Sequence, residues 1–243
     1  RFAVKALLRT SDHRTRLLQE NEVRLHNRAS GHPSILTLYH VVDEGLFTYM
    51  VMELCPYGDL FRVIESEFFS NNVRAIKSTY GQLLDALVHC HSLGIYHRDI
   101  KPENILVKCY EDECPKIVLA DFGLATEDLK DSGAIGSELY MSPECLGLYG
   151  KAMPDYACAA NDVWSMGVIL SLLIFGPNVP WSMASDQCEH FAAYCNNIDW
   201  YFIEYFNVTV EANHLLTATF RLNPYQRITI NALQADFHLV DQF

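Results

Sequence analysis

His97–Gly123, HRDIKPENILVKCYEDECPKIVLADFG, is the stretch of this chain that says most about its fold and chemistry. It holds two polar clusters, His97–Asn104 and Asp121–Gly123, and each adjoins an apolar run typical of a β-strand. Ile105–Val107 follows the first cluster, and Ile117–Ala120 precedes the second. The acidic turn between the two runs predicts a β-hairpin that brings the polar clusters to one point.

Four side chains in these clusters fit the needs of phosphoryl transfer. Asn104 and Asp121 offer the hard oxygen ligands that hold Mg²⁺ together with substrate phosphates. Lys101 is a point charge suited to a phosphoryl oxygen, and Asp99 is a carboxylate free to accept a hydroxyl proton. In-line phosphoryl transfer requires a protein mainly to position groups and neutralise charge. A solvated polar hairpin, the plain alternative, does not account for this spacing.

The run HRDIKPEN followed by DFG resembles the catalytic loop and metal-binding loop of eukaryotic protein kinases. A lone Asp-Phe-Gly would be weak, but the eight-residue run and the DFG occur in the family order. The resemblance implies an α+β, bilobal protein-kinase-like fold, with a small β-rich N-lobe and a large helical C-lobe. It places a partial N-lobe at residues 1–54 and the C-lobe at residues 55–243, with ATP and Mg²⁺ in the cleft between them.

The first strand predicted from the sequence, Phe2–Leu8, contains a lysine, Lys5. A lysine in a strand is usually an exposed edge charge, but in the kinase resemblance it holds the α- and β-phosphates of the nucleotide. It would then need a carboxylate to fix its position. The helical segment Arg14–Arg28 offers Glu22 at the family offset, and Glu20 is a rival better explained by surface pairing with an arginine. We favour Glu22.

A glycine-rich loop is expected on the two strands before Lys5 of a kinase, and no Gly-x-Gly-x-x-Gly occurs in this sequence. Either the sequence is a fragment of a longer protein, or the protein lacks this phosphate lid. The start at Arg1, without an initiator Met, favours the fragment.

Ile35–Val42 and Leu46–Met52 are predicted as the next two strands. In the kinase resemblance, the residues after these strands, Glu53–Gly58, match the hinge between the lobes, and Met52 matches the gatekeeper position. Asp59 either approaches the ribose or is a charge at the N-terminus of a helix. The resemblance assigns nucleotide binding to Lys5, Glu22, Met52, Glu53, Cys55, Asp59, Leu106 and Asp121.

Two long helices are predicted in the C-lobe. Val73–Leu93 is amphipathic, with apolar residues at helical spacing, and contributes to the core rather than to the chemistry. Val163–Phe175 is an apolar run well short of the roughly 20 residues that span a bilayer, so it is interpreted as a buried helix. In the kinase pattern His97 packs in the core, which leaves Asp99 as the catalytic base.

Gly136–Glu144 resembles the peptide-docking segment of kinases that ends in Ala-Pro-Glu, with Ser142 in place of the alanine. The resemblance puts the hydroxyl of Ser137 near Asp99 and Lys101.

The usual phosphorylation site of kinases, three residues before Gly136, is occupied by Gly133, and Ser132 is a candidate substitute. We expect activity that does not depend on phosphorylation here, because an acidic side chain can take the place of a phosphate beside Arg98. The acidic residues available for this are Glu127, Asp128 and Asp131.

Asn223–Ile228 matches a late kinase motif whose arginine pairs with the glutamate of Ala-Pro-Glu. This predicts a buried ion pair between Arg227 and Glu144. Phe191–Tyr194 and Arg221–Pro224 are similar to stretches of fungal kinases that restrain sexual development.

Other interpretations are weaker. A pseudokinase scaffold is favoured only by the missing glycine-rich loop. A serine hydrolase would depend on Ser165, but the first glycine of G-x-S-x-G is absent and the serine falls inside a predicted helix. Gly147–Lys151 mimics a P-loop with the wrong spacing. Cys109 and Cys114 lack the partner pair that a zinc site needs.

Composition limits the class of protein. Of 243 residues, 50% are hydrophobic and 20% charged, which is typical of a globular chain. The net charge of −12 argues against general nucleic-acid or membrane binding. Eight cysteines without a framework pattern favour a reducing compartment, cytoplasmic and/or nuclear.

Lys101 within the catalytic loop points to Ser/Thr rather than Tyr specificity. We expect a monomeric catalytic domain that acts on protein substrates. Acidic Asp59 and Glu103 favour substrates with basic residues before the acceptor.

Overall fold

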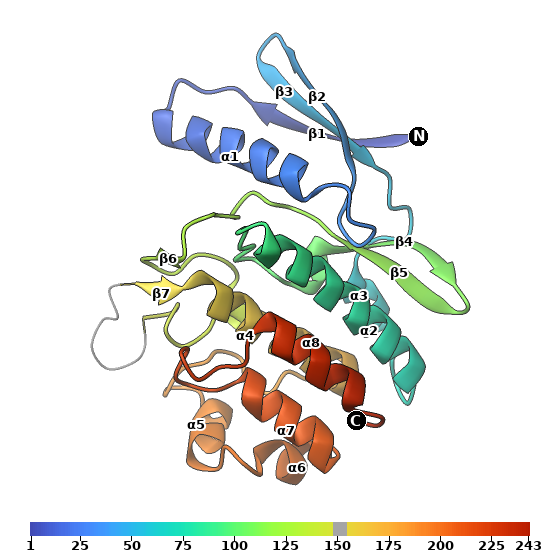
Figure 1. The fold of residues 1–243 in the computed structure, drawn as a ribbon, viewed down its shortest axis with the longest axis vertical. Coiled ribbons are helices and arrows are strands. Elements are labelled where there is room, and N and C mark those ends of the chain that lie inside the picture. The colour runs from blue at the N-terminus through green and yellow to red at the C-terminus, as the bar shows by residue number, and fades with distance from the viewer. Residues whose placement is uncertain (148–154) are drawn as a thin grey trace.

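The computed structural model describes residues 1–147 and 155–243. A sheet with one helix lies above a larger helical part in Figure 1, and the N-terminus belongs to the upper part. Most of the P-loop-like stretch Gly147–Lys151 lies outside the described residues.

Three strands of the upper part form one antiparallel sheet in the order β1-β3-β2. They are β1 (Phe2–Leu8), β2 (Leu38–Glu44) and β3 (Phe47–Glu53). Lys5 pairs with Met50 in the register of the β1–β3 ladder. The strand expected at Ile35–Val42 therefore begins three residues late. The reason is that Ile35 bridges to Leu119 of the lower part instead, and Leu36 donates its N–H to the Leu119 carbonyl at 2.9 Å.

Helix α1 (His13–Ala29) extends the predicted helix by one residue at each end and lies alongside the sheet in Figure 1. Asp12 caps its start, because the side chain accepts the N–H of Thr15 at 2.8 Å. The buried residues of α1 share one face at helical spacing: Glu22, Leu25, His26 and Ala29. A carboxylate is therefore carried inward on the apolar face of the helix.

The hairpin predicted from the opening stretch is present as β4 (Ile105–Glu111) and β5 (Cys114–Leu119). Asp112 and Glu113 form its turn with φ of 49° and 63°, the backbone that a tight two-residue hairpin requires. The hairpin packs on α3 (Val73–Ser92), the amphipathic helix expected from the sequence. A shorter helix, α2 (Leu60–Glu65), begins after the hinge.

The remaining elements make up the rest of the lower part. They are β6 (Lys130–Asp131), β7 (Tyr156–Ala157), α4 (Cys158–Phe175), α5 (Glu189–Asn196), α6 (Tyr201–Phe206), α7 (Val210–Thr219) and α8 (Ile230–Leu239).

Helix α4 is long and apolar enough to cross a membrane, but 78% of it is buried inside the fold. It is therefore the buried helix that the sequence predicted. It packs tightly on α7: a Cβ added to Gly167 would lie 2.7 Å from the Thr219 methyl carbon, so only glycine fits there. The indole of Trp164 on the same helix packs edge-on against Phe220, with the ring centroids 4.9 Å apart.

The predicted ion pair between Arg227 and Glu144 is confirmed. Two guanidinium nitrogens donate to the two carboxylate oxygens at 2.6 and 3.0 Å, and both side chains are buried. The guanidinium also lies over the Trp164 ring, 4.9 Å from its centroid. This pair fastens the end of the docking segment to the helical core.

Replacing Arg227 by Met should lower the free energy of unfolding by about 3–5 kcal/mol, because Glu144 would remain buried without a partner. Urea unfolding of the variant measures the loss. The double variant Arg227→Met, Glu144→Leu is the control and should recover part of it, since it removes the stranded charge. A loss for the single variant below about 1 kcal/mol, the value of an exposed pair, would contradict this assignment.

Candidate active site

A buried carboxylate on α4, Asp162, fixes the backbone of the catalytic loop. Its oxygens accept the N–H of His97 at 2.9 Å and that of Arg98 at 2.8 Å. His91 at the end of α3 contacts the same carboxylate at 2.9 Å. Arg98 has a φ of +64°, a strained conformation for a non-glycine residue that the surroundings must impose. Asp162 imposes it, and so directs the next residue, Asp99, into the cleft.

The catalytic-loop residues predicted from the sequence lie together around Asp99. Lys101 Nζ lies 2.8 Å from Asp99 Oδ2. Ser137 Oγ donates to Asp99 Oδ1 at 2.9 Å and accepts from Lys101 Nζ at 2.9 Å. Asn104 Nδ2 donates to the carbonyl and the carboxylate of Asp99, at 2.8 and 3.0 Å.

Gly136 allows Ser137 to approach so closely. Its φ is +119°, and a Cβ there would lie 2.5 Å from the carbonyl oxygen of Arg98. A side chain at this position would push the docking segment away from the catalytic loop.

Lys5 lies between two carboxylates, one on α1 and one just after β5. Its Nζ is 2.6 Å from Glu22 Oε1 and 3.0 Å from Asp121 Oδ1. Burial works against its charge, but the hydrogen bonds and charges of the two carboxylates raise the pKa of Lys5 above its ordinary value. Burial likewise works against the Asp121 charge, but Lys5 holds the pKa of Asp121 below its ordinary value. Lys5 and Asp121 are therefore both charged at neutral pH. Glu20, the alternative partner considered for Lys5, pairs instead with Arg16 at 3.7 Å, as the sequence predicted.

The residues present fit Mg²⁺ that is bound together with a phosphate-bearing ligand. Asp121 has an ionised carboxylate that is half exposed, and a φ of +59°, a strained backbone of the kind found at ligand sites. Asn104 uses its Nδ2 on Asp99, which leaves its amide oxygen for a ligand. No group of three or more His, Cys, Asp or Glu gathers among the described residues. Such a site suits Mg²⁺, which commonly takes one or two protein ligands plus substrate phosphates. The same finding argues against a zinc site at Cys109 and Cys114 within the described chain.

An apolar surface suited to a nucleobase lies beside the hinge. It combines three buried and three half-buried side chains: Leu36, Val118, Ala120, Met52, Cys55 and Leu106. The Glu53 N–H donates to the Thr37 carbonyl at 2.9 Å, so this N–H is already paired within the protein. Burial, aided by the Glu53 carboxylate, raises the pKa of the Cys55 thiol to about 11, so the thiol stays neutral.

Asp59 caps α2 by accepting the N–H of Arg62 at 3.1 Å. Asp59 therefore acts as a charge at the N-terminus of a helix, one of the two roles that the sequence predicted for it. A role for Asp59 at the ribose remains a prediction.

The sequence did not single out two residues that organise the site, Asp162 and His26. His26 is buried on α1, stacks on Phe122 with ring centroids 5.0 Å apart, and contacts the Leu36 carbonyl at 2.7 Å. His97 packs edge-on against the same phenyl ring at 5.1 Å. For Asp162, the available sequence signal was an ionisable residue directly before a long apolar run. For His26, the signal was its four-residue spacing from Glu22, which puts both residues on the buried face of α1.

Ser165 has no access to a substrate. It is buried in α4, and its hydroxyl donates to the Tyr140 carbonyl at 2.7 Å. The serine-hydrolase interpretation is therefore excluded by its surroundings.

Arg98 does meet one of the three acidic side chains expected from the sequence, and that side chain is Asp131. The other two candidates lie elsewhere. Glu127 pairs with arginines of α1, and Asp128 accepts the Thr126 hydroxyl at 3.2 Å.

Asp162→Asn should destabilise the protein by about 1–3 kcal/mol, because the amide cannot accept both backbone N–H groups and one buried donor loses its partner. Urea unfolding measures the loss. Amide hydrogen exchange should also accelerate at His97 and Arg98. Unchanged exchange at these two amides would contradict the role given to Asp162.

Comparisons with known proteins agree with this geometry. A family model described as the protein kinase domain matches residues 1–238. The chain is 38% identical to a negative regulator of sexual conjugation and meiosis of Schizosaccharomyces pombe, over 96% of this chain and 53% of that protein. It is 30% identical to the serine/threonine-protein kinase SKS1 of Saccharomyces cerevisiae, over 96% and 48% respectively. It is 33% identical to the serine/threonine-protein kinase ksp1 of S. pombe, over 86% and 45%. The chain spans about half the length of these relatives. The chain belongs to the protein kinase family.

Proposed function

We propose that the protein is a serine/threonine protein kinase that transfers the γ-phosphoryl group of ATP to Ser or Thr hydroxyls of protein substrates. One observation carries the proposal: Asp99, Lys101 and Ser137 lie within 2.9 Å of one another, and Lys5 contacts both Glu22 and Asp121. The relatives named serine/threonine-protein kinases support the same activity.

Each side chain has a distinct role in this proposal. ATP bound with Mg²⁺ supplies the phosphoryl group, which passes to the acceptor oxygen while ADP leaves. Asp99 orients the acceptor hydroxyl and takes its proton. Lys101 and Lys5 contact phosphate oxygens, and Asn104 and Asp121 hold the metal. Glu22 keeps Lys5 extended toward the cleft.

A pseudokinase that binds partners without transfer is the alternative. The comparisons give it no support, and the sequence contains Asp99, Asn104, Asp121 and Lys5, the side chains that transfer would need. Loss of transfer with nucleotide binding intact would be its signature.

The substrate class is a finer part of the proposal. Asp59 caps the start of α2, and Glu103 lies in the short helical turn Pro102–Asn104 of the catalytic loop, so each adds an acidic side chain. We propose that basic residues before the acceptor improve a substrate, by charge complementarity. We also propose a monomeric catalytic domain that acts in the cytoplasm or the nucleus, where its eight thiols stay reduced.

The first test measures radiolabel transfer from Mg·ATP to a mixed Ser/Thr peptide library by the protein from its full open reading frame. Asp99→Asn and Asp121→Ala should each reduce transfer by about 10²-fold or more, because one lacks the base and the other a metal ligand. Arginine-containing peptides should be the better substrates. No transfer by a folded, nucleotide-binding wild type would favour the pseudokinase, and indifference to arginine would remove the basic preference.

Ser132→Ala should leave the transfer rate unchanged, because the Asp131 carboxylate already neutralises Arg98. Asp131→Asn is the matched control and should lower the rate, since it removes that neutralisation one residue away. Lost activity in Ser132→Ala would show that phosphorylation of this segment is needed after all.

A further inference from the structure

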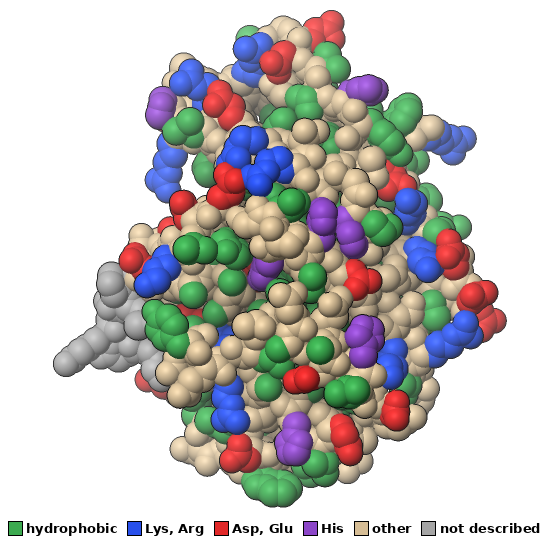
Figure 2. Space-filling view, viewed as in Figure 1, with side chains coloured by type: hydrophobic (Ala, Val, Ile, Leu, Met, Phe, Trp, Pro, Cys, Tyr) green, Lys and Arg blue, Asp and Glu red, His purple; other side chains and the backbone are tan. Residues whose placement is uncertain are grey.

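The carboxylate of Glu127 contacts two arginines of α1 at once. Its Oε2 lies 2.6 Å from Arg24 Nη2, and its Oε1 forms an ion pair with Arg28. These arginines are four residues apart, so they project from the same side of the helix. Figure 2 shows basic and acidic side chains in contact at the boundary beneath the upper part of the molecule. Asn21 of α1 adds a hydrogen bond to the Ala125 carbonyl at 2.9 Å.

The segment that carries Glu127 is itself fixed to the lower part of the molecule. Thr126 and Tyr96 exchange backbone hydrogen bonds at 2.8 and 2.9 Å, just before the catalytic loop. Arg28 also donates to the carbonyl of Leu93, the residue that ends α3, at 3.0 Å. A carboxylate anchored to the lower part therefore holds a helix of the upper part.

We propose that Glu127 is a positioning residue for the phosphoryl transfer proposed above: it holds α1 where Glu22 reaches Lys5, without any added phosphate. Glu22 lies two residues before Arg24 on the same rigid helix. A rotation or outward shift of α1 that separates Glu22 from Lys5 would also pull the arginines from Glu127. The contact thus favours the arrangement in which Lys5 is held for the nucleotide.

The electrostatics agree with this role. Hydrogen bonds from Arg24 and Arg28 hold the pKa of Glu127 below its ordinary value, so it is ionised at neutral pH. The three side chains are 38–49% exposed, which means that each pair is individually weak and screened by salt. One carboxylate shared by two guanidinium groups makes a small network rather than an isolated pair. A moderate effect that depends on salt is therefore expected.

The test compares Glu127→Gln with the wild type in steady-state transfer assays. The variant should lose about three- to tenfold in kcat/KM for ATP, because a smaller fraction of molecules has Lys5 in place. The KM for the peptide should not change, since Asp99, Lys101 and Ser137 are untouched. Added salt should lower the kcat/KM for ATP of the wild type toward that of the variant.

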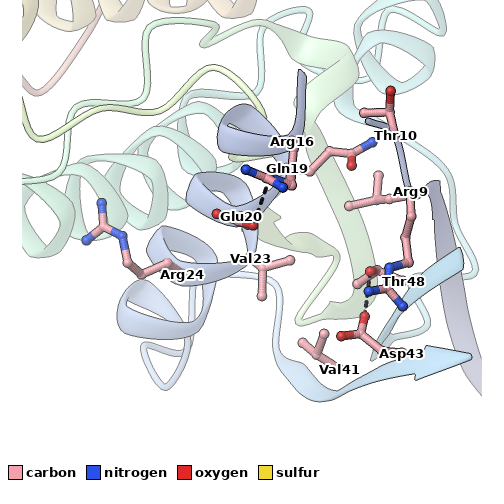
Figure 3. Close-up of a pocket in the computed structure, with 11 residues that line it drawn as sticks. Arg9, Thr10, Arg16, Gln19, Glu20, Val23, Arg24, Val41, Asp43 and Thr48 are labelled. Carbon is pink, nitrogen blue, oxygen red and sulfur yellow. Dashed lines mark hydrogen bonds and ion pairs between the residues drawn. The ribbon is translucent and has the colours of Figure 1, made fainter. Parts of the chain in front are cut away.

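Two matched controls remove a charge without touching this contact. Asp128→Asn changes the next residue, which accepts the Thr126 hydroxyl. Glu20→Gln removes a carboxylate of α1 that pairs with Arg16 beside the hollow between α1 and the sheet, whereas Arg24 points away from them (Figure 3). Both controls should behave as the wild type in the ATP parameters. A loss in either control equal to that of Glu127→Gln would overturn the proposal.

Charge reversal tests the pairing itself. Glu127→Lys alone, and Arg24→Glu with Arg28→Glu, should each lower kcat/KM, and the triple variant should regain much of the loss. Absence of any regain would mean that the contact does not carry the effect.

Amide hydrogen exchange of α1 tests the contact independently of catalysis. Exchange across the helix should be faster in Glu127→Gln than in the wild type, even if the protein transfers no phosphate. Equal exchange with equal kinetics would overturn the positioning role and leave the proposed kinase activity standing. Faster exchange in Glu127→Gln, together with a wild-type protein that transfers no phosphate, would instead count against the kinase activity alone.

Discussion

The conformation of the catalytic loop depends on one interaction, in which two backbone N–H groups donate to a single buried carboxylate. Asp162 holds His97 and Arg98 in a conformation that the chain would not otherwise adopt. The carboxylate is held in place because α4 is buried along most of its length. The positions of Asp99 and its neighbours then follow from the short loop that leads from this anchor to the β4–β5 hairpin.

The upper part of the molecule depends on the lower part for its catalytic geometry. Lys5 and Glu22 lie on a sheet and a helix of the upper part, and Asp121 belongs to the lower part. His26 stacking on Phe122 and the Glu127 contact join the same two regions. One contact is buried and apolar, and the other is exposed and ionic. The ring stacking packs α1 against the lower part, and in our proposal the ionic contact further favours that position of the helix.

Much of the site could be predicted because its residues lie close together in sequence. The β4–β5 hairpin, the ring of side chains around Asp99 and the amphipathic α3 depend on spacings of a few residues, which local patterns encode. Predictions failed where distant segments compete. The strand expected from Ile35 begins at Leu38, because the backbone of Ile35 forms a β-bridge with Leu119 instead of joining the sheet. The sequence limited the partner of Arg98 to three carboxylates. Only the path of the chain between Gly123 and Gly136 selected Asp131 among them.

The sequence by itself determined the family, the candidate catalytic side chains and the pairing of Arg227 with Glu144, since each belongs to a motif whose residue types are dictated by its chemistry. Only the tertiary structure decided how these motifs are held. Asp162, Gly136 and Glu127 act across gaps of about 40 to 100 residues, through a buried acceptor, a close backbone approach and a shared charge. Such contacts leave no local periodicity in the chain, because they depend on where packing brings two distant surfaces together.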